Sequence, residues 1–229
     1  MASSHGKSAL SALALLLVWA GASSPSAAEA QERDMFGGAQ PSETAGQIAD
    51  WVAASGDNRG LPYMIIDKVA AQVFVFGPDG QLRGATPALL GVARGDHSAP
   101  GVGDMALSAI PVADRTTPAG RFVAAYGPAI GSPDVLWVDY ATAVSLHPVV
   151  TTNRKERRME RLQSPTPDDN RITFGCINVA AAFYDEVVHP AFTGTKSVIY
   201  VLPEVAPLDE VFPSLHARLG SRAHGGSQR

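Results

Sequence analysis

A single cysteine, Cys176, has the clearest chemical potential in this 229-residue chain. It follows Thr173 and Gly175 and leads into a segment of helical composition. A thiol in this setting is a candidate nucleophile, because backbone N–H groups of the turn can stabilise an oxyanion and a helix N-terminus favours the thiolate. The alternative is that Cys176 is a small buried hydrophobic residue without a chemical role.

A cysteine nucleophile needs a base, because a thiol with an unperturbed pKa of about 8.5 is mostly protonated at neutral pH. The six histidines are His5, His97, His147, His189, His216 and His224. His147 ends the apolar run from Val144 to Leu146, where a core strand delivers a side chain to the rim of a sheet. His147 is therefore the first candidate base.

The N-terminal residues 1–30 have the layout of a secretory signal, with Lys7, an apolar run from Ala9 to Ala22 and small residues ending at Ala30. We expect an exported protein, periplasmic or associated with the cell wall, without a stable membrane span. One cysteine cannot form an internal disulfide, so Cys176 is either buried and inert or kept for its chemistry.

The charge balance gives no electrostatic reason to expect a nucleic-acid partner. The chain has 22 acidic and 18 basic residues and a formal charge of −4 at pH 7. Its length suits one domain with a substantial core and small additions.

Short β-rich runs separated by Gly and Pro clusters predict a mostly β fold with flanking helices, a largely antiparallel sandwich or barrel with the cysteine on a strand-to-helix loop. The predicted strands are Met64–Asp67, Gln72–Phe76, Pro87–Val92, Met105–Ile110, Arg121–Tyr126, Val135–Tyr140, Thr142–Leu146 and Ser197–Leu202. The predicted helices are Glu43–Ala54, Ala180–Val188 with Asn178 as its cap, and one near Leu208–Leu219. The predicted divisions are a signal peptide (1–30), an extension with one helix (31–60), a catalytic domain (61–203) and a C-terminal helix with a tail (204–229).

A polar stretch from Thr151 to Asn170 interrupts the strand pattern, and we predict a short charged helix followed by a Pro-rich loop. One interpretation is a solvated surface excursion. The other is a substrate-facing loop, in which Arg154, Lys155, Arg157 and Arg158 meet carboxylates of a substrate.

Several segments, taken in order, resemble an L,D-transpeptidase catalytic domain of the YkuD type over roughly residues 61–203. Met64–Lys68 and Gln72–Phe76 resemble its opening hairpin, and Thr117–Phe122 matches its Thr-Pro-x-Gly-x-Phe loop. His147 matches its upstream histidine, and Thr173–Asn178 matches its Ser/Thr-His-Gly-Cys-x-Asn/Arg signature.

The resemblance implies acyl transfer on peptidoglycan stem peptides, in cell-wall biogenesis and cell shape, without a metal or organic cofactor. Cys176 would attack the bond after meso-diaminopimelate, releasing D-Ala and forming a thioester that a stem amine, a protein lysine or water resolves. His147 would be base and then acid, and the N–H groups of Gly175 and Cys176 would hold the oxyanion. Thr173 and Asn178 would position the loop.

Three departures from the family pattern leave alternatives open. Phe174 replaces a second histidine and is a possible substrate-facing residue, Pro148 replaces a glycine after His147, and the interval of 29 positions from His147 to Cys176 is long. A carboxypeptidase or hydrolase, and a catalytically silent wall-binding module of the same fold, are the alternatives. A papain-like hydrolase, with His189 or His216 as base, is a further one.

Overall fold

The computed structural model describes residues 35–37, 39–129 and 132–215. The predicted signal peptide and the end of the predicted C-terminal helix lie outside these residues. The strands are β1 (Tyr63–Asp67), β2 (Gln72–Phe76), β3 (Leu82–Pro87), β4 (Leu90–Gly91), β5 (Gly120–Ala129), β6 (Ser132–Asp139), β7 (Val144–Pro148), β8 (Arg171–Thr173), β9 (Ile177–Val179) and β10 (Ser197–Val201). The α-helices are α2 (Glu43–Ser55), α3 (Arg158–Leu162), α4 (Ala181–Phe183), α5 (His189–Phe192) and α6 (Leu208–Val211). Short 3-10 helices are η1 (Val102–Asp104), η2 (Leu107–Ala109), η3 (Val112–Asp114), η4 (Arg154–Glu156) and η5 (Pro167–Asn170), and η6 (Tyr184–Val188) is π-helical.

One eight-stranded sheet forms the centre of the fold, in the order β3-β2-β1-β10-β5-β6-β7-β9. It curves toward closure, because the backbone of Asn178 in edge strand β9 exchanges two hydrogen bonds with Leu89, just after β3 at the opposite edge. Strands β4 and β8 form a small separate sheet beside this junction. The prediction of a mostly β fold with flanking helices is confirmed.

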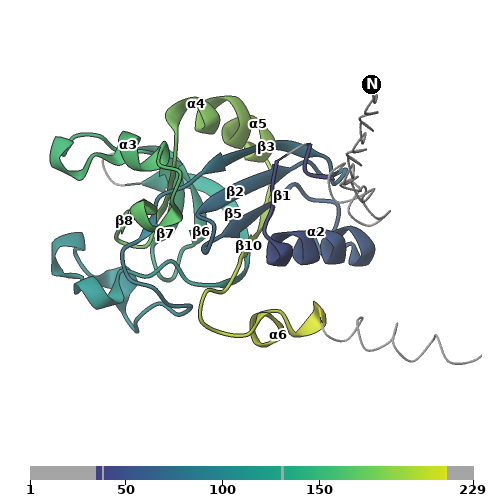
Figure 1. Ribbon diagram of the computed structural model, residues 1–229, viewed down its shortest axis with the longest axis horizontal. Coiled ribbons are helices and arrows are strands. Elements are labelled where there is room, and N and C mark those ends of the chain that lie inside the picture. Colours follow the sequence, from purple (N-terminus) through teal and green to yellow (C-terminus); the bar gives the residue numbers. More distant parts are fainter. Residues whose placement is uncertain (1–34, 38, 130–131, 216–229) are drawn as a thin grey trace, which may run out of the picture.

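Two hydrophobic cores lie on the two faces of the central strands, because successive side chains of a strand point to opposite faces. Met64 and Ile66 of β1 lie in one core, whereas Tyr63 and Ile65 lie in the other. The second core also contains the apolar face of α2, so the predicted helix over Glu43–Ala54 is confirmed and packs on the sheet (Figure 1).

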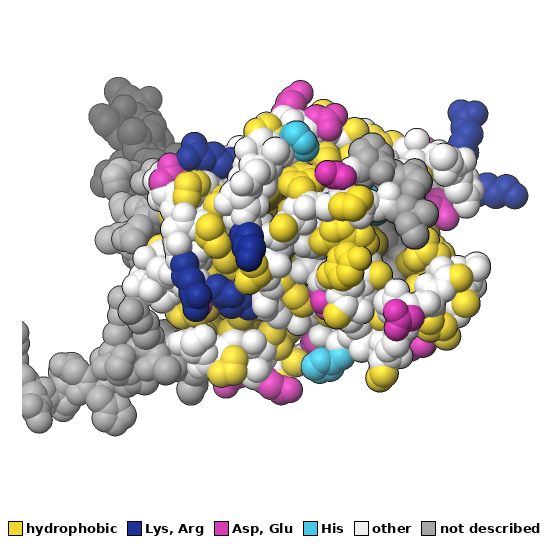
Figure 2. Space-filling view, turned by 180° about the vertical axis from the view of Figure 1, so that it is seen from behind, with side chains coloured by type: hydrophobic (Ala, Val, Ile, Leu, Met, Phe, Trp, Pro, Cys, Tyr) yellow, Lys and Arg dark blue, Asp and Glu magenta, His cyan; other side chains and the backbone are white. Residues whose placement is uncertain are grey.

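Helices α4 and α5 lie at the other side of the sheet from α2, and α3 lies at the end of the molecule far from α2 (Figure 1). The first core extends beneath the segment of α4, η6 and α5 and includes Tyr184, Val188 and Phe192. Among the described residues, no helix has both the length and the hydropathy to span a bilayer. On the described part of the face in Figure 2, hydrophobic side chains are interspersed with small groups of charged ones.

The largely antiparallel pairing is confirmed, with parallel exceptions where β1 pairs with β10 and β7 pairs with β9. Some predicted elements were wrong. The predicted strand Met105–Ile110 instead contains the 3-10 helix η2, with Leu107 exposed and no partner strand among its described contacts. Only Leu90 and Gly91 of the predicted strand Pro87–Val92 form the separate strand β4.

The segment after the cysteine also differs from the prediction. Ile177–Val179 forms strand β9, so the cysteine lies on a strand-to-strand turn rather than on a strand-to-helix loop. The helix starts at Ala181 without a side-chain cap, so Asn178 is not its N-cap. The β-branched Ile177 and Val179 and the backbone bonds of Asn178 to Leu89 favour the strand over the helix.

Candidate active site

The parallel pairing of β7 with β9 brings the candidate base beside the loop that carries the cysteine. His147 is in register with Asn178, and Leu146 is in register with Ile177. Cys176 directly precedes β9, so the same register places it beside Ser145 of β7. The two residues selected from the sequence as nucleophile and base, Cys176 and His147, therefore lie close enough for each side chain to shift the pKa of the other.

The imidazole of His147 is held at both ring nitrogens. Nδ1 lies 2.8 Å from the carbonyl oxygen of Pro148 and Nε2 lies 3.0 Å from Nδ2 of Asn178. A carbonyl oxygen only accepts hydrogen bonds, so Nδ1 carries the proton and Nε2 carries the lone pair. His147 is thus in the tautomer in which Nε2 can accept a proton. Pro148 lacks an N–H group, but it contributes the carbonyl that fixes this tautomer.

The thiol of Cys176 is half-buried and contacts polar groups of β7 and of the turn that precedes it. Its Sγ lies 3.6 Å from Oγ of Ser145 and 3.8 Å from the carbonyl oxygen of Ala143. Burial alone raises the pKa of Cys176, but its interactions with His147 and Ser145 lower it, and the net shift is downward. The pKa of His147 is shifted upward, since its interaction with Cys176 outweighs the effect of burial. These opposite shifts favour proton transfer from the thiol to the imidazole.

The turn before Cys176 is stabilised by the side chain of Thr173. Its hydroxyl donates to the carbonyl oxygen of Cys176 at 2.6 Å and accepts from the N–H of Gly175 at 3.2 Å. Among the described residues, the N–H of Cys176 has no hydrogen-bond partner, so it is free to donate to an oxyanion. The expectation that Gly175 also donates needs correction, because Thr173 already accepts from its N–H.

The Thr117 loop supports this turn from the other side. The buried hydroxyl of Thr117 donates to the carbonyl oxygen of Gly175 at 2.8 Å and accepts from the N–H of Gly91 at 2.9 Å. Gly175 has φ 129°, and a Cβ atom there would lie 2.8 Å from the carbonyl oxygen of Thr116. Glycine is therefore required by both the backbone conformation and the close approach.

Phe174, at the position of the missing second histidine, is covered by an arginine. The guanidinium carbon of Arg115 lies 4.1 Å from the centroid of the Phe174 ring, and its Nε donates to the carbonyl oxygen of Ile110 at 3.0 Å. Arg115 forms no ion pair within the described part of the chain. The guanidinium of Arg115 is therefore held over the ring of Phe174, which lies two positions before Cys176, and its terminal nitrogens are available.

The arginines of the 151–170 excursion have different environments. Arg154 and Arg157 are exposed, and Arg157 lies 3.8 Å from Glu160. Arg158 instead turns inward, where its Nη1 donates to Oδ1 of Asn178 at 2.7 Å and its Nε contacts Glu156. The predicted short charged helix is confirmed as α3, preceded by η4. Arg158 thus joins Asn178 and His147 in one hydrogen-bonded network, called the histidine network below. Arg154 and Arg157 remain possible substrate contacts.

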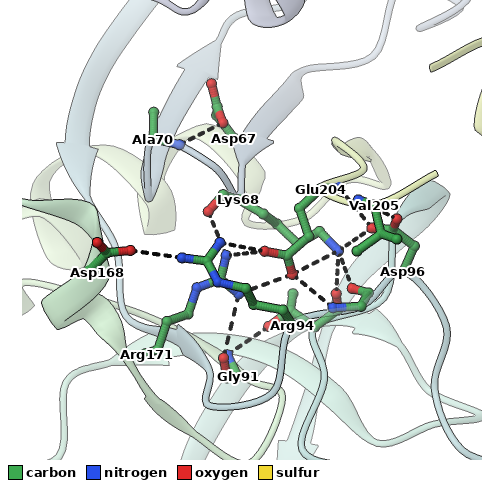
Figure 3. A network of polar contacts seen from close by, with 12 residues as sticks. Asp67, Lys68, Ala70, Gly91, Arg94, Asp96, Asp168, Arg171, Glu204 and Val205 are labelled. Carbon is green, nitrogen blue, oxygen red and sulfur yellow. Dashed lines mark hydrogen bonds and ion pairs between the residues drawn. The ribbon is translucent and has the colours of Figure 1, made fainter. Parts of the chain in front are cut away.

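A buried charge cluster anchors the strand that leads into the cysteine turn (Figure 3). Lys68, fully buried after β1, lies 2.7 Å from Asp96 and 3.6 Å from Glu204. Arg171, the first residue of β8, pairs with Glu204 and donates to the carbonyl oxygen of Lys68 at 2.7 Å. The cluster joins the end of β1, the Asp96 loop, β8 and the segment after β10.

Sequence reasoning missed Ser145, Thr117, Arg115 and the inward direction of Arg158. Ser145 lies two positions before His147, so the strand period alone places both side chains on one face. Thr117 was part of the recognised Thr-Pro motif, but its contact with Gly175 spans 58 positions. No local pattern marks such contacts.

The other described histidines do not join the site. His189 is exposed on α5, and its ring packs against Tyr126 with centroids 5.4 Å apart. His216 lies outside the described residues. Within those residues, no group of three or more His, Cys, Asp or Glu side chains is arranged to hold a metal ion.

Comparisons with known proteins give only distant likenesses. No family model and no curated protein sequence matches the chain. An L,D-transpeptidase from Mycobacterium smegmatis is 18% identical with a TM-score of 0.37, and the match covers 61% of this chain and 58% of that one. The catalytic domain of the E. faecium L,D-transpeptidase is 16% identical with a TM-score of 0.37, over 62% of this chain and 96% of that domain. The helical cell shape determining protein Pgp2 (K307A mutant) from Campylobacter jejuni is 13% identical with a TM-score of 0.44, over 80% of this chain and 65% of that one.

The matched structures thus include L,D-transpeptidases, the family that the sequence motifs resemble. Identities of 18% or less and TM-scores below 0.5 mark a distant likeness. The function proposed next therefore rests on the residues around Cys176.

Proposed function

We propose that this protein is a cysteine-dependent L,D-transpeptidase that acts on peptidoglycan stem peptides. The observation that carries the proposal is that Cys176 lies beside a histidine whose Nδ1–H is fixed by Pro148, so that Nε2, which accepts from Asn178, is the ring nitrogen that can take a proton. A thiol of lowered pKa beside a base of raised pKa is the arrangement of a cysteine nucleophile. The assignment of stem peptides as the substrate is based on the sequence motifs.

In the first half-reaction, Nε2 of His147 gives up its hydrogen bond from Asn178 and takes the thiol proton, and Sγ of Cys176 attacks the carbonyl carbon by which meso-diaminopimelate is bonded to D-Ala. The N–H of Cys176 is the donor that we expect at the developing oxyanion. As the C–N bond breaks, His147 returns the proton to the leaving amine, D-Ala departs and a thioester remains. An acceptor amine then attacks the thioester, its proton passes to His147, and the thiol is restored.

Arg115 is the group that we expect to bind a carboxylate of the stem peptide. Its guanidinium is held by the Phe174 ring and by Ile110, so little side-chain freedom is lost when a carboxylate binds. The exposed Arg154 and Arg157 are a second possible contact. The acceptor, whether a stem amine or a protein lysine, distinguishes cross-linking from protein attachment.

The test is intact-protein mass spectrometry after incubation with a tetrapeptide-stem muropeptide. The unsubstituted protein should gain the mass of the acyl donor minus D-Ala, and Cys176→Ala should gain nothing. His147→Ala should form no thioester. Product masses separate cross-links from hydrolysis, which would indicate a carboxypeptidase. If neither an adduct nor released D-Ala is seen while muropeptide binding is equal in the protein and in Cys176→Ala, the proposal is wrong and a silent wall-binding module is supported.

A further inference from the structure

Arg158 stands apart from its neighbours in the 151–170 excursion because its side chain is buried against the histidine network. The side chain of Arg158 is 11% exposed, whereas that of Arg157 is 71% exposed. Arg157 adopts a left-handed φ of 50° at the junction of η4 and α3. Glu156 accepts from Nε of Arg158 at 2.5 Å, which leaves Nη1 directed at Asn178.

The contact with Arg158 fixes which way the amide of Asn178 points. A guanidinium has only hydrogen-bond donors, so the Asn178 atom 2.7 Å from Nη1 of Arg158 is the oxygen Oδ1. The amide nitrogen Nδ2 then faces His147, at 3.0 Å from Nε2. The orientation of an amide that is otherwise ambiguous is set by this pairing.

The orientation of Asn178 in turn selects the charge state of His147. Nδ2 donates, so Nε2 must present a lone pair, and Pro148 already requires the proton on Nδ1. A rotated Asn178 could accept from a protonated Nε2, but its NH₂ group would then face the donors of Arg158. The positive charge of Arg158 also lowers the pKa of His147, against the raising effect of Cys176.

We propose that Arg158 is a positioning residue that holds His147 in its neutral, Nδ1-protonated form before the thiol proton is transferred, by fixing the amide of Asn178. The proposal rests on the proposed function in naming His147 the base. Within the described residues, the charged or titratable groups that face this ring are Cys176 and Arg158, with Glu156 behind Arg158. The excursion thereby acts on the reaction through a side chain that does not touch the substrate.

The test is a titration of His147 followed by the ¹⁵N shifts of its ring, which report both the tautomer and the protonation state. His147→Gln assigns the signal. In Arg158→Gln the amide of Asn178 can rotate and the cation is gone, so we expect the pKa of His147 to rise by about 1. Arg158→Lys should titrate like the unsubstituted protein. Arg157→Gln is the matched control, because it removes the same charge from an exposed neighbour.

A second variant keeps the proposal testable if Arg158→Gln does not fold. Asn178→Asp presents an oxygen to both Arg158 and His147 and turns the hydrogen bond from Arg158 into an ion pair, so it too should raise the pKa of His147. Circular dichroism shows which variants are folded. If His147 titrates in the folded variants Arg158→Gln or Asn178→Asp as it does in Arg157→Gln, the positioning role is wrong.

The rate of Cys176 alkylation by iodoacetamide gives an independent readout. The proposal predicts that Arg158→Gln shifts the pH profile of alkylation, whereas a purely structural role would lower the rate at all pH values. Neither measurement uses the muropeptide. If no acyl-enzyme forms with the muropeptide but Arg158→Gln still raises the pKa of His147, the proposed function fails and the positioning role stands; the reverse pattern rejects the positioning role alone.

Discussion

Replacement of Asp96 by Asn should be among the most destabilising single changes in the fold. Asp96 accepts from the backbone N–H groups of Glu204, Val205 and Ala206 and from Nζ of Lys68, at 2.6–2.9 Å. Both carboxylate oxygens accept only, so an Asn amide placed either way brings its NH₂ group against another donor. Lys68, which is fully buried, would also lose its nearest counter-charge.

The magnitude follows from the environment of Asp96. Its side chain is 2% exposed, and its contacts lower its pKa from 3.8 to about 2. Burial opposes this shift, but the hydrogen bonds from Lys68 and the three backbone groups outweigh it. The lowering corresponds to about 2 kcal/mol of folding free energy. Removing one partner of a buried ion pair costs about 3–5 kcal/mol, and we expect Asp96→Asn to fall in this range.

The assay is urea denaturation at pH 7, with Asp168→Asn as the control. Asp168 also pairs with an arginine, Arg94 at 2.7 Å, but its side chain is 76% exposed. Exposed pairs contribute about 0–1 kcal/mol, so this variant should unfold near the unsubstituted protein. If Asp96→Asn lowers the free energy of unfolding by no more than Asp168→Asn does, the account of the charge cluster is refuted.

The same residue predicts a pH dependence. The pKa of Asp96 is lower in the folded state than in the unfolded state, so its stabilisation is fully present above pH 4 or so and is lost as the pH falls toward about 2. Acid unfolding of Asp96→Asn should lack this component. Unfolding curves that keep the same separation between the two proteins from pH 5 to pH 2 would contradict the assignment.

Three further predictions concern the loops around Cys176. Thr117→Val leaves the N–H of Gly91 and the carbonyl of Gly175 without their partner, so it should lower the free energy of unfolding by about 2–4 kcal/mol; Thr117→Ser keeps both bonds and should cost less than half as much by the same denaturation assay. Gly175→Ala should slow iodoacetamide alkylation of Cys176 about 10-fold or more, because its Cβ meets the carbonyl of Thr116 and displaces the turn; an unchanged rate would show that the turn tolerates a side chain. Arg115→Gln should raise KM for the muropeptide about tenfold with kcat little changed, whereas an equal fall in kcat would mean that Arg115 acts in the transition state instead.

The elements that the sequence predicts well are those in which the pattern of apolar side chains alone indicates which face is buried. Met64–Asp67 and Gln72–Phe76 are dense in β-branched and aromatic residues, and both are strands. The helix over Glu43–Ala54 has an apolar face at helical spacing and a serine cap at Ser42. Segments that depend on distant partners were predicted poorly. Strand β9 exists because Asn178 pairs with Leu89 and His147, whereas the sequence predicted Asn178 only as the cap of a helix over Ala180–Val188.

In the candidate site, too, some residues could be predicted from the sequence and others depend on distant contacts. Cys176 and His147 follow from residue type and from the end of a strand, and the structure brings them together. The direction of Arg158 does not follow, since three charged neighbours at similar spacing look equivalent in sequence. Neither expectation for this arginine was met, because it is neither a solvated side chain nor aligned as a substrate contact.

Asn178 links the completion of the fold to the chemistry of the thiol. Its backbone joins the two ends of the sheet at Leu89, 89 positions away, and its side chain holds the base. Contacts of such large sequence separation form late, after the cost of loop closure has been met. An incompletely folded chain therefore has a cysteine of ordinary acidity, mostly protonated and slow to react at neutral pH. The Cys176 thiol therefore becomes reactive at neutral pH only when β9 has paired with its neighbours. Its alkylation rate consequently also reports whether the protein is folded.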